Sequence, residues 1–526
     1  MTASAIMIFS HLKTSLLKRS DIHYSIYVLG LMVLAAALPL SHFLMGLATF
    51  VLFLNWLAEW NWKEKWQRIC QEKVGFVFGA LYLFLFLGLI RTDNWHAASH
   101  ELLAQLPLIF MPVLLVTSRP LSANSTRFVI HSFIFSTLFC CVCGWIYFFK
   151  NNLTELREMS LFVDHIRFSL CTVLAFVLSA SYMIHSNSAD NLRVLYGMLA
   201  LLFFVYVLFS HTLTGIVCLL VIIFCYCLYH IIAAPKRQKW QSATALVLLF
   251  LFSIYVAWIT VLFFKDQDKV ITTTVTEAGN PYTFDANTPV ENGHRIGYYI
   301  CREELQKAWT LRSDSALTES REQVLIRYLN SRGLHKDYAA LMSLKHKDIK
   351  NIEQGVSNYI YLHTIDFRSV LYPTYFSLSL YHHSNYIANS SLLERVELWK
   401  ASLNILREQP LLGVGVGDQK DVVDAQLERQ HSSIAEKKQR GSHNQYLTFA
   451  LMGGVFMVLY FFYMMLYPFV RMRHKIHFVY VAFVLMMLMS MLIEDTLETQ
   501  TGRMLFSMMM PLLLLYWPEK DNPIKG

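Results

Sequence analysis

Twelve long stretches of mostly apolar residues decide what this chain of 526 residues can fold into. A helix needs about 20 apolar residues to cross a bilayer, with about 17 as the lower limit. The stretches lie near residues 24–40, 43–58, 74–90, 103–118, 128–149, 165–184, 194–210, 212–233, 243–264, 446–470, 476–493 and 501–517. With 55% hydrophobic and 16% charged residues, the composition excludes an ordinary soluble protein. We predict an all-α polytopic membrane protein with about twelve transmembrane helices, or eleven because only Ser41 and His42 separate the first two stretches.

Basic residues predict how these helices are oriented, because Lys and Arg accumulate in short cytoplasmic loops. With a cytoplasmic N-terminus, eighteen of them fall on the inner side: Lys13, Lys18, Arg19, Lys63, Lys65, Arg68, Lys73, Arg119, Arg127, Arg193, Lys236, Arg237, Lys239, Arg471, Arg473, Lys475, Lys520 and Lys525. Only four fall in the short outer loops: Arg91, Lys150, Arg157 and Arg503. Both termini are therefore predicted to be cytoplasmic. The same bias explains most of the net charge of +8, so the charge indicates no nucleic-acid partner.

The hydrophilic segment at residues 265–445 divides the chain into three predicted regions. Nine helices precede it in residues 1–264, and three follow it in residues 446–526. About 180 residues are too many for an unstructured connection. Helical patterns occur at residues 303–309, 320–331 and 348–354, and Gly333 and Gly355 follow two of the predicted ends, as C-terminal glycine caps do. We predict one large, mostly helical external loop between the ninth and tenth helices.

A further helix is predicted from Ser391 to Arg407, with Pro410 beyond its end. Its expected apolar stripe consists of Leu392, Val396, Trp399, Leu403 and Leu406. Arg395 borders this stripe, one helical turn from Trp399. Such an arginine can lay its stem over the tryptophan and keep its charge in water, or it can present its guanidinium to an anion. The spacing leaves both possibilities open.

Three glycines follow in the sequence PLLGVGVGD, residues 410–418. Gly413, Gly415 and Gly417 permit positive φ angles and close backbone approach, which suits a turn that offers amide donors to an anion. The pattern lacks the Lys and the Ser or Thr that complete a P-loop. Alone, it does not identify a ligand.

His443 lies in the sequence GSHNQ, residues 441–445, directly before the tenth predicted span. An imidazole that titrates near neutrality can accept a proton from a hydroxyl group, so His443 is a candidate general base. Alternatively, Ser442 or Asn444 caps the next helix, and His443 is an ordinary residue at the membrane surface.

The order of these motifs resembles the O-antigen ligase and polymerase superfamily. The motifs are E-R-x-x-x-W at Glu394, Arg395 and Trp399, then P-L-x-G-x-G-x-G-D at residues 410–418, then H-N-x-Y-L at His443, Asn444, Tyr446 and Leu447, followed by Gly453 and Gly454. They cover about residues 390–455, and the order of the spans extends the resemblance along the chain. Residues 325–355 and 494–502 also resemble the variant of this family that is found in Bacteroidetes.

The resemblance implies a glycosyltransferase of the bacterial inner membrane with a periplasmic active loop. Such enzymes move a glycan from undecaprenyl diphosphate to a hydroxyl of lipid A-core or another acceptor, among membrane lipids, with inversion and without a metal or cofactor. Arg395 matches the family's loop arginine, which stabilises the diphosphate, and His443 matches its essential histidine, which acts as the base. Trp399, Asn444 and the glycines at 413, 415 and 417 are assigned to substrate binding.

One residue expected from the family is missing. The family carries an arginine at the external start of a span before the loop, where this chain has Leu213 in the sequence SHTLTG. The second cation for the diphosphate must come from elsewhere or be absent. Arg167, at the outer end of the sixth span, is the first candidate, because ionisable residues at membrane depth are usually functional. Arg368 is the second and His211 the third. Asp164 could instead hold Arg167 in a structural pair.

An acidic cluster lies outside the eleventh predicted span, at Glu494, Asp495 and Glu498. These residues either pair with arginines of the loop, which would bring Glu494 and Glu498 to the substrate, or mark a solvated helix end.

Several functions compete for this sequence. A ligase hands a finished polysaccharide to lipid A-core, a polymerase joins two lipid-linked units, and a protein O-oligosaccharyltransferase transfers the glycan to protein. A transporter of lipid-linked glycans would need no chemistry, but transporters tend to have two related halves, which this sequence does not show. The contiguous H-N-x-Y-L motif after the glycine turn favours the ligase.

Overall fold

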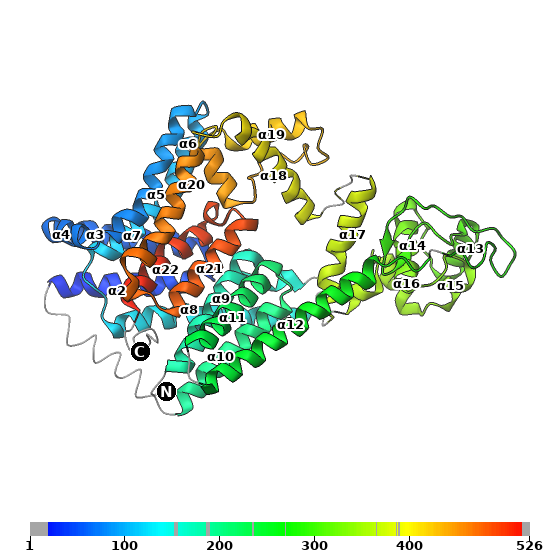
Figure 1. The fold of residues 1–526 in the computed structure, drawn as a ribbon, viewed down its shortest axis with the longest axis horizontal. Coiled ribbons are helices and arrows are strands. Elements are labelled where there is room, and N and C mark those ends of the chain that lie inside the picture. Colours follow the sequence, from blue (N-terminus) through cyan, green and yellow to red (C-terminus); the bar gives the residue numbers. More distant parts are fainter. Residues whose placement is uncertain are drawn as a thin grey trace. The chain divides into compact units, whose positions relative to one another are not determined.

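The computed structural model describes residues 19–151, 156–185, 190–233, 236–268, 270–363, 366–384, 387 and 390–517 (Figure 1). All twelve predicted apolar stretches fall on helices. The first nine correspond to α2 (Arg19–Ala37), α3 (His42–Ala58), α5 (Val74–Gly88), α6 with α7 (Trp95–Gln105 and Pro107–Thr117), α8 (Ala123–Asn151), α9 (His165–His185), α10 (Asp190–Phe209), α11 (Leu213–Ala233) and α12 (Lys236–Phe264). The last three correspond to α20 (Gln445–Arg471), α21 (Phe478–Ile493) and α22 (Gln500–Tyr516). The predicted all-α membrane class is confirmed.

Length and composition qualify eight of the described helices as membrane spans, or nine if one bent pair counts as a span. The bent pair is α3 with α4 (Trp62–Gln71), and the bend is 111°. Two further apolar helices, Asp21–Ala37 and Phe478–Ile493, are shorter. The count of twelve spans and the orientation of the termini therefore stay predictions.

The chain divides into two units, residues 1–228 with 398–526 and residues 229–397. The division differs from the predicted regions 1–264, 265–445 and 446–526, because α12 falls in the second unit and residues 398–445 fall in the first. The predicted regions refer to the membrane rather than to packing, and they stay a prediction.

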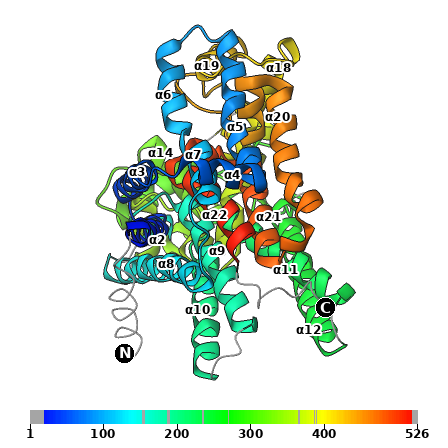
Figure 2. The same cartoon turned by 90° about the vertical axis from the view of Figure 1, so that its left-hand side faces the viewer.

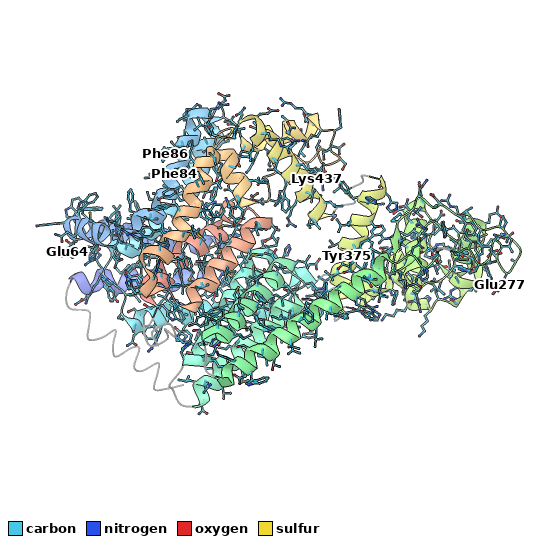
Figure 3. The ribbon with its side chains drawn as sticks, viewed as in Figure 1. Glu64, Phe84, Phe86, Glu277, Tyr375 and Lys437 are labelled. Carbon is cyan, nitrogen blue, oxygen red and sulfur yellow. The ribbon has the colours of Figure 1, made fainter. Side chains whose placement is uncertain are left out.

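Helix α22 forms the core of the first unit, since nearly every residue from Thr501 to Leu514 is buried. It packs against α3, α5, α7 and α21. Helix α5 also packs along α20, where the ring of Phe84 stacks on Tyr460 with 4.1 Å between their centroids. Figures 2 and 3 show α5 beside α20, and Figure 3 labels Phe84. This pairing fixes α20 beyond its break at Gly454; the helix begins at Gln445, two residues after His443.

The second unit contains the polar helices that were predicted between residues 303 and 354. They are α13 (Arg302–Arg312), α14 (Glu319–Ser331) and α16 (His346–Glu353), with α15 (Tyr338–Ser343) between the last two. Gly333 and Gly355 have φ angles of 68° and 88° just past two helix ends, as predicted. Their shared core includes Leu305, Trp309 and Leu329, each fully buried. These helix predictions are confirmed.

A buried ion pair ties a short hairpin to α14 in the second unit. The hairpin pairs β1 (Val290–Glu291) with β2 (His294–Arg295) in antiparallel register. Glu291 is completely buried and accepts hydrogen bonds from Arg327 Nε at 2.9 Å and Nη2 at 2.8 Å. Asn358 Nδ2 donates to the same carboxylate at 3.0 Å, and Phe376 of α17 (Arg368–Ser384) lies 3.5 Å below the guanidinium. One ion pair therefore joins three parts of this unit.

A hydroxyl pair joins α17 to the long helix α12 in the same unit. Tyr375 and Thr260 hydroxyls lie 2.7 Å apart, and Figure 3 labels Tyr375.

The helix predicted to begin at Ser391 is confirmed as α18 (Ser391–Glu408). The apolar stripe predicted for its buried face is wrong. Leu403, a predicted stripe residue, is 48% exposed, and Leu392, Val396, Trp399 and Leu406 are only half-buried. The buried residues are Leu393, Leu398, Ala401, Ser402 and Ile405. Both sets follow helical spacing, so periodicity could not separate them; the packing partners decide which face is covered.

Candidate active site

The chain enters α20 through a loop that a single carboxylate holds in place. Asp495 follows α21 and accepts hydrogen bonds from the backbone amides of His443 at 2.8 Å and Asn444 at 3.0 Å, and from Thr448 Oγ1 at 2.7 Å. His443 has a φ angle of 50°, which is uncommon for a residue other than glycine. The hydrogen bonds that these two backbone amides donate to Asp495 therefore hold an unfavourable backbone conformation. They also fix the position of the imidazole.

Glu494 brings the candidate base and the candidate diphosphate cation together. Its Oε2 atom lies 3.6 Å from His443 Nδ1 and 3.3 Å from Arg167 Nη2. The Glu494 side chain is 2% exposed, whereas that of His443 is 37% exposed. One buried carboxylate thus lies near both the imidazole and the guanidinium, and the imidazole is partly exposed.

Arg167 lies in the first turn of α9 and contacts two carboxylates. Besides Glu494, it reaches Asp164, whose Oδ1 lies 3.1 Å from Arg167 Nη1 and also accepts a hydrogen bond from the Ile166 amide at 3.0 Å. The structural pair with Asp164 that we considered is present. It does not exclude a functional role, because the other edge of the guanidinium faces Glu494 at the candidate site.

The turn at residues 210–215, where the family arginine was expected, packs against the start of α9. A Cβ atom on Gly215 would lie 2.9 Å from Ser169 Cβ, two residues after Arg167. Arg167 therefore comes from a helix that adjoins the position of Leu213. His211, the third candidate cation, is half-buried with a φ angle of 52°, and its role stays a prediction.

Glu498, in the short helix η5 (Thr496–Glu498), has partners other than the predicted loop arginines. Its Oε1 accepts hydrogen bonds from Gln105 Nε2 at 3.0 Å and Gln445 Nε2 at 3.4 Å. Burial raises the pKa of Glu498 well above its usual value, and the nearby Glu101 raises it further. These contacts support a role in joining α6 to α20.

The glycine turn docks into a break in α20. Gly454 has φ 68° and ψ −163° inside the helix, and the Val455 amide donates to Pro410 O at 3.0 Å rather than to its own helix. In exchange, Leu451 O accepts from the Val414 amide at 2.8 Å and the Gly415 amide at 3.3 Å. The turn and the helix complete each other's backbone hydrogen bonds.

These contacts favour packing over the predicted anion site. Gly413 and Gly415 do adopt positive φ angles, 68° and 112°. However, the amides of residues 414 and 415 are directed at Leu451 O, and the Gly417 amide is directed at Thr92 Oγ1 at 3.5 Å. The next residue, Asp418, accepts from the amides of Asp93 and Asn94 ahead of α6. Figures 1 and 2 show α19 (Gln419–Arg429) near α6 and α20.

Asn444 caps α20, which was the alternative to its predicted role in substrate binding. Its Oδ1 accepts from the Tyr446 amide at 3.0 Å and the Leu447 amide at 3.1 Å, and its Nδ2 donates to Leu492 O at 2.8 Å. Both ends of the side-chain amide are therefore used within the protein.

Three other predicted residues lie outside this cluster. Arg395 belongs to the unit of residues 229–397, whereas His443 belongs to the other unit, so their joint action stays a prediction. Arg368 also belongs to that second unit, where the carboxylate of Asp366 binds it at 2.6 Å and raises its pKa. Trp399 is half-buried, and among the described residues its indole Nε1 has no hydrogen-bond partner.

Sequence reasoning missed Asp495 as a site residue and did not identify the partner of Glu494. The available sequence signal was a pair of adjacent carboxylates at the end of an apolar helix, because a buried charge is costly unless it is paired. The pairing itself could not be read, because 327 residues separate Arg167 from Glu494.

Replacing Gly454 by alanine should separate the glycine turn from α20. A Cβ atom there would lie 1.9 Å from Leu411 O, at a backbone conformation that only glycine adopts readily. We expect a loss of about 2–4 kcal/mol in unfolding free energy, measured by thermal denaturation of the detergent-purified protein. Gly46→Ala is the control, because its Cβ would meet only Gln500 Nε2, at 3.9 Å. Equal stability of the two variants would contradict the docking role.

Comparison with known proteins agrees with the motifs in this half of the chain. Residues 355–462 match the model of a family described as O-antigen ligase. The match contains Arg395, the glycine turn and His443, whereas Arg167 and Glu494 lie outside it. No curated protein matches the chain. The match supports membership of the O-antigen ligase and polymerase superfamily through this region of the chain, residues 355–462.

Proposed function

We propose that this protein is an O-antigen ligase-type glycosyltransferase that moves a polysaccharide from undecaprenyl diphosphate to lipid A-core. It would act at the periplasmic face of the bacterial inner membrane, with both termini in the cytoplasm. The observation that carries the proposal is the cluster of His443, Glu494 and Arg167, in which one carboxylate faces an imidazole and a guanidinium. A base and a cation side by side suit transfer from a diphosphate to a hydroxyl group.

The reaction follows from the chemistry of the two groups. In the tautomer with its proton on Nδ1, His443 has its lone pair on Nε2 and can take the proton of the acceptor hydroxyl. The acceptor oxygen bonds to the anomeric carbon as the bond from that carbon to the diphosphate oxygen breaks. The electron pair leaves with the diphosphate, where Arg167, together with the family arginine Arg395, stabilises the added charge. Attack from the side opposite the leaving group inverts the anomeric carbon.

Deletion of the gene tests the function through the lipopolysaccharide profile. We expect core without any polymer on a gel, together with polymer that accumulates on undecaprenyl diphosphate, because ligation is the step that consumes this intermediate. A plasmid copy should restore the ladder, and a copy carrying His443→Ala should not.

Two other profiles contradict the ligase. Core that bears a single repeat unit would identify a polymerase. Unchanged lipopolysaccharide with a loss of glycoproteins would identify a protein O-oligosaccharyltransferase.

A further inference from the structure

We infer that α4 (Trp62–Gln71) lies in the plane of the membrane at its surface, with its tryptophans among the phospholipid headgroups. The helix follows α3 after a bend of 111°. Length and composition would also allow α3 and α4 together to form one broken span. In the arrangement that we infer, α3 crosses the bilayer alone and α4 runs along its surface. This inference does not depend on the proposed function.

Helix α4 is too short and too charged to cross a bilayer. Its 10 residues extend for about 15 Å, half of the hydrocarbon thickness. A charged side chain inside the hydrocarbon is costly, and the first two turns of α4 carry four: Lys63, Glu64, Lys65 and Arg68. Figure 3 labels Glu64. The helix therefore lies outside the hydrocarbon core, either at the membrane surface or in water.

The exposed side chains of α4 divide into an apolar side and a polar side. Trp62, Trp66 and Ile69 recur at steps of four and three residues, so they share one side of the helix. Trp66 is 72% exposed, and Trp60, just before the helix, is 75% exposed. The adjacent exposed side is polar and consists of Lys63, Gln67 and Gln71. A helix in a bilayer surface needs this arrangement, with apolar side chains toward the acyl chains and polar ones toward water.

The remaining side of α4 is charged, and it faces the protein. Lys65 is 3% exposed; its Nζ donates to Trp56 O and lies 3.1 Å from Glu59 Oε2, both at the end of α3. Arg68 Nη1 donates to Thr117 O, at the end of α7, at 2.9 Å. A helix that packs on a protein in water buries its apolar side and exposes its charged side. The reverse holds for α4, which indicates that the tryptophans meet lipid.

The bend that lays α4 along the surface is built into the protein. Lys65 Nζ lies 4.9 Å from the centroid of the Trp56 ring in α3 and 5.2 Å from that of the Trp62 ring in α4, so one ammonium group joins the two helices. Trp60, between them, has a φ angle of 49°, a conformation that commonly ends helices. A right-angle bend after an upright span places a helix in the membrane plane, and 111° is close to it.

Phospholipid is the occupant that the neighbouring surface favours. Phe50 and Leu54, one turn apart on α3, are 58% and 47% exposed, so the outer side of the helix that leads to Trp60 is apolar. In a multi-pass membrane protein, such a side meets acyl chains. Tryptophan is enriched where the acyl chains end, because its ring is apolar and its N–H group is polar. With the predicted orientation of the chain, this is the cytoplasmic interface.

Spin labels on the full-length protein measure the depth of α4 in nanodiscs of phosphatidylethanolamine and phosphatidylglycerol. Single labels are placed by Phe50→Cys, Trp66→Cys and Gln71→Cys. The background carries Cys70→Ala, Cys143→Ala and Cys225→Ala, because these three cysteines are not buried. Collisions with oxygen, which concentrates in lipid, and with a water-soluble nickel chelate give each depth. We expect the label at 66 about 5–10 Å into the boundary of headgroups and acyl chains, the label at 50 deeper, and the label at 71 in water.

Trp60→Cys supplies an independent label outside the helix, and we expect it at the same depth as the label at 66. Both replaced side chains are largely exposed, so each variant should keep the thermal denaturation midpoint of the unlabelled background. A shifted midpoint in one variant leaves the other to decide the depth.

Three results would overturn the inference. Labels at 60 and 66 that collide with the nickel chelate as often as the label at 71 would place α4 in water. Labels as deep as the one at 50 would make α4 part of a broken span. Labels that neither reagent reaches would mean that protein, such as a second copy of this chain, covers the tryptophans.

Discussion

Replacing His443 by alanine is expected to lower the rate of glycan transfer by about 10²- to 10⁴-fold, the contribution of a positioned general base. The imidazole is 37% exposed, with Glu494 Oε2 3.6 Å from its Nδ1 atom, and replacement by a methyl group removes the group that is proposed to take the proton. The measurement is transfer of polymer from the lipid-linked donor that accumulates in the deletion strain to lipid A-core, by the purified full-length variant.

Two further variants distinguish a loss of catalysis from a folding defect. His443→Asn should be equally inactive but better folded, because asparagine tolerates the positive φ angle that Asp495 imposes at this position. His474→Ala should be fully active: His474 lies just past the other end of α20, in η4 (Arg473–Lys475), and is exposed. Near wild-type transfer by His443→Asn would remove His443 from the mechanism.

The helices of this protein could be predicted because their signals are long and local. A stretch of about 20 apolar residues has few alternatives in lipid, so the twelve stretches all became helices. In the second unit, Gly333 and Gly355 marked helix ends through a conformation that glycine adopts readily. The face of α18 was not predictable, since Leu403 and Ile405 fit helical periodicity equally well and only the packing partners distinguish them.

Single candidate residues could be chosen from the sequence, but their arrangement could not be predicted from it. His443 followed from its motif, and Arg167 followed from the cost of an ionisable group at membrane depth. Their common partner, Glu494, and the backbone contact of Asp495 depend on α9, α20 and α21 coming together. The glycine turn shows the converse: its positive φ angles were predicted, but its amides bind Leu451 O of α20, which lies outside the local sequence.

Replacing Arg327 by methionine should unfold the region of the second unit around α14, with a loss of about 3–5 kcal/mol. The variant leaves the completely buried carboxylate of Glu291 without its two hydrogen bonds from the guanidinium, and an unpaired buried charge costs this much. Hydrogen exchange of the α14 amides in the full-length protein measures the loss locally. Arg302→Met is the matched control, because Arg302 is 76% exposed in its contact with Glu322, and its loss should cost less than about 1 kcal/mol.

The double variant Arg327→Met with Glu291→Met decides whether the ion pair itself stabilises this unit. Removing both charges eliminates the unpaired carboxylate, and apolar replacements of buried pairs are often neutral or stabilising. We therefore expect the double variant to recover most of the stability lost by Arg327→Met. Asn358, whose Nδ2 donates to Glu291 at 3.0 Å, would then lose its acceptor, so recovery should stop short of wild type by about 1 kcal/mol. A double variant as unstable as Arg327→Met would contradict this expectation. It would mean that the hydrogen bonds of the pair to β1 and residue 358 stabilise the unit, and that charge compensation is secondary.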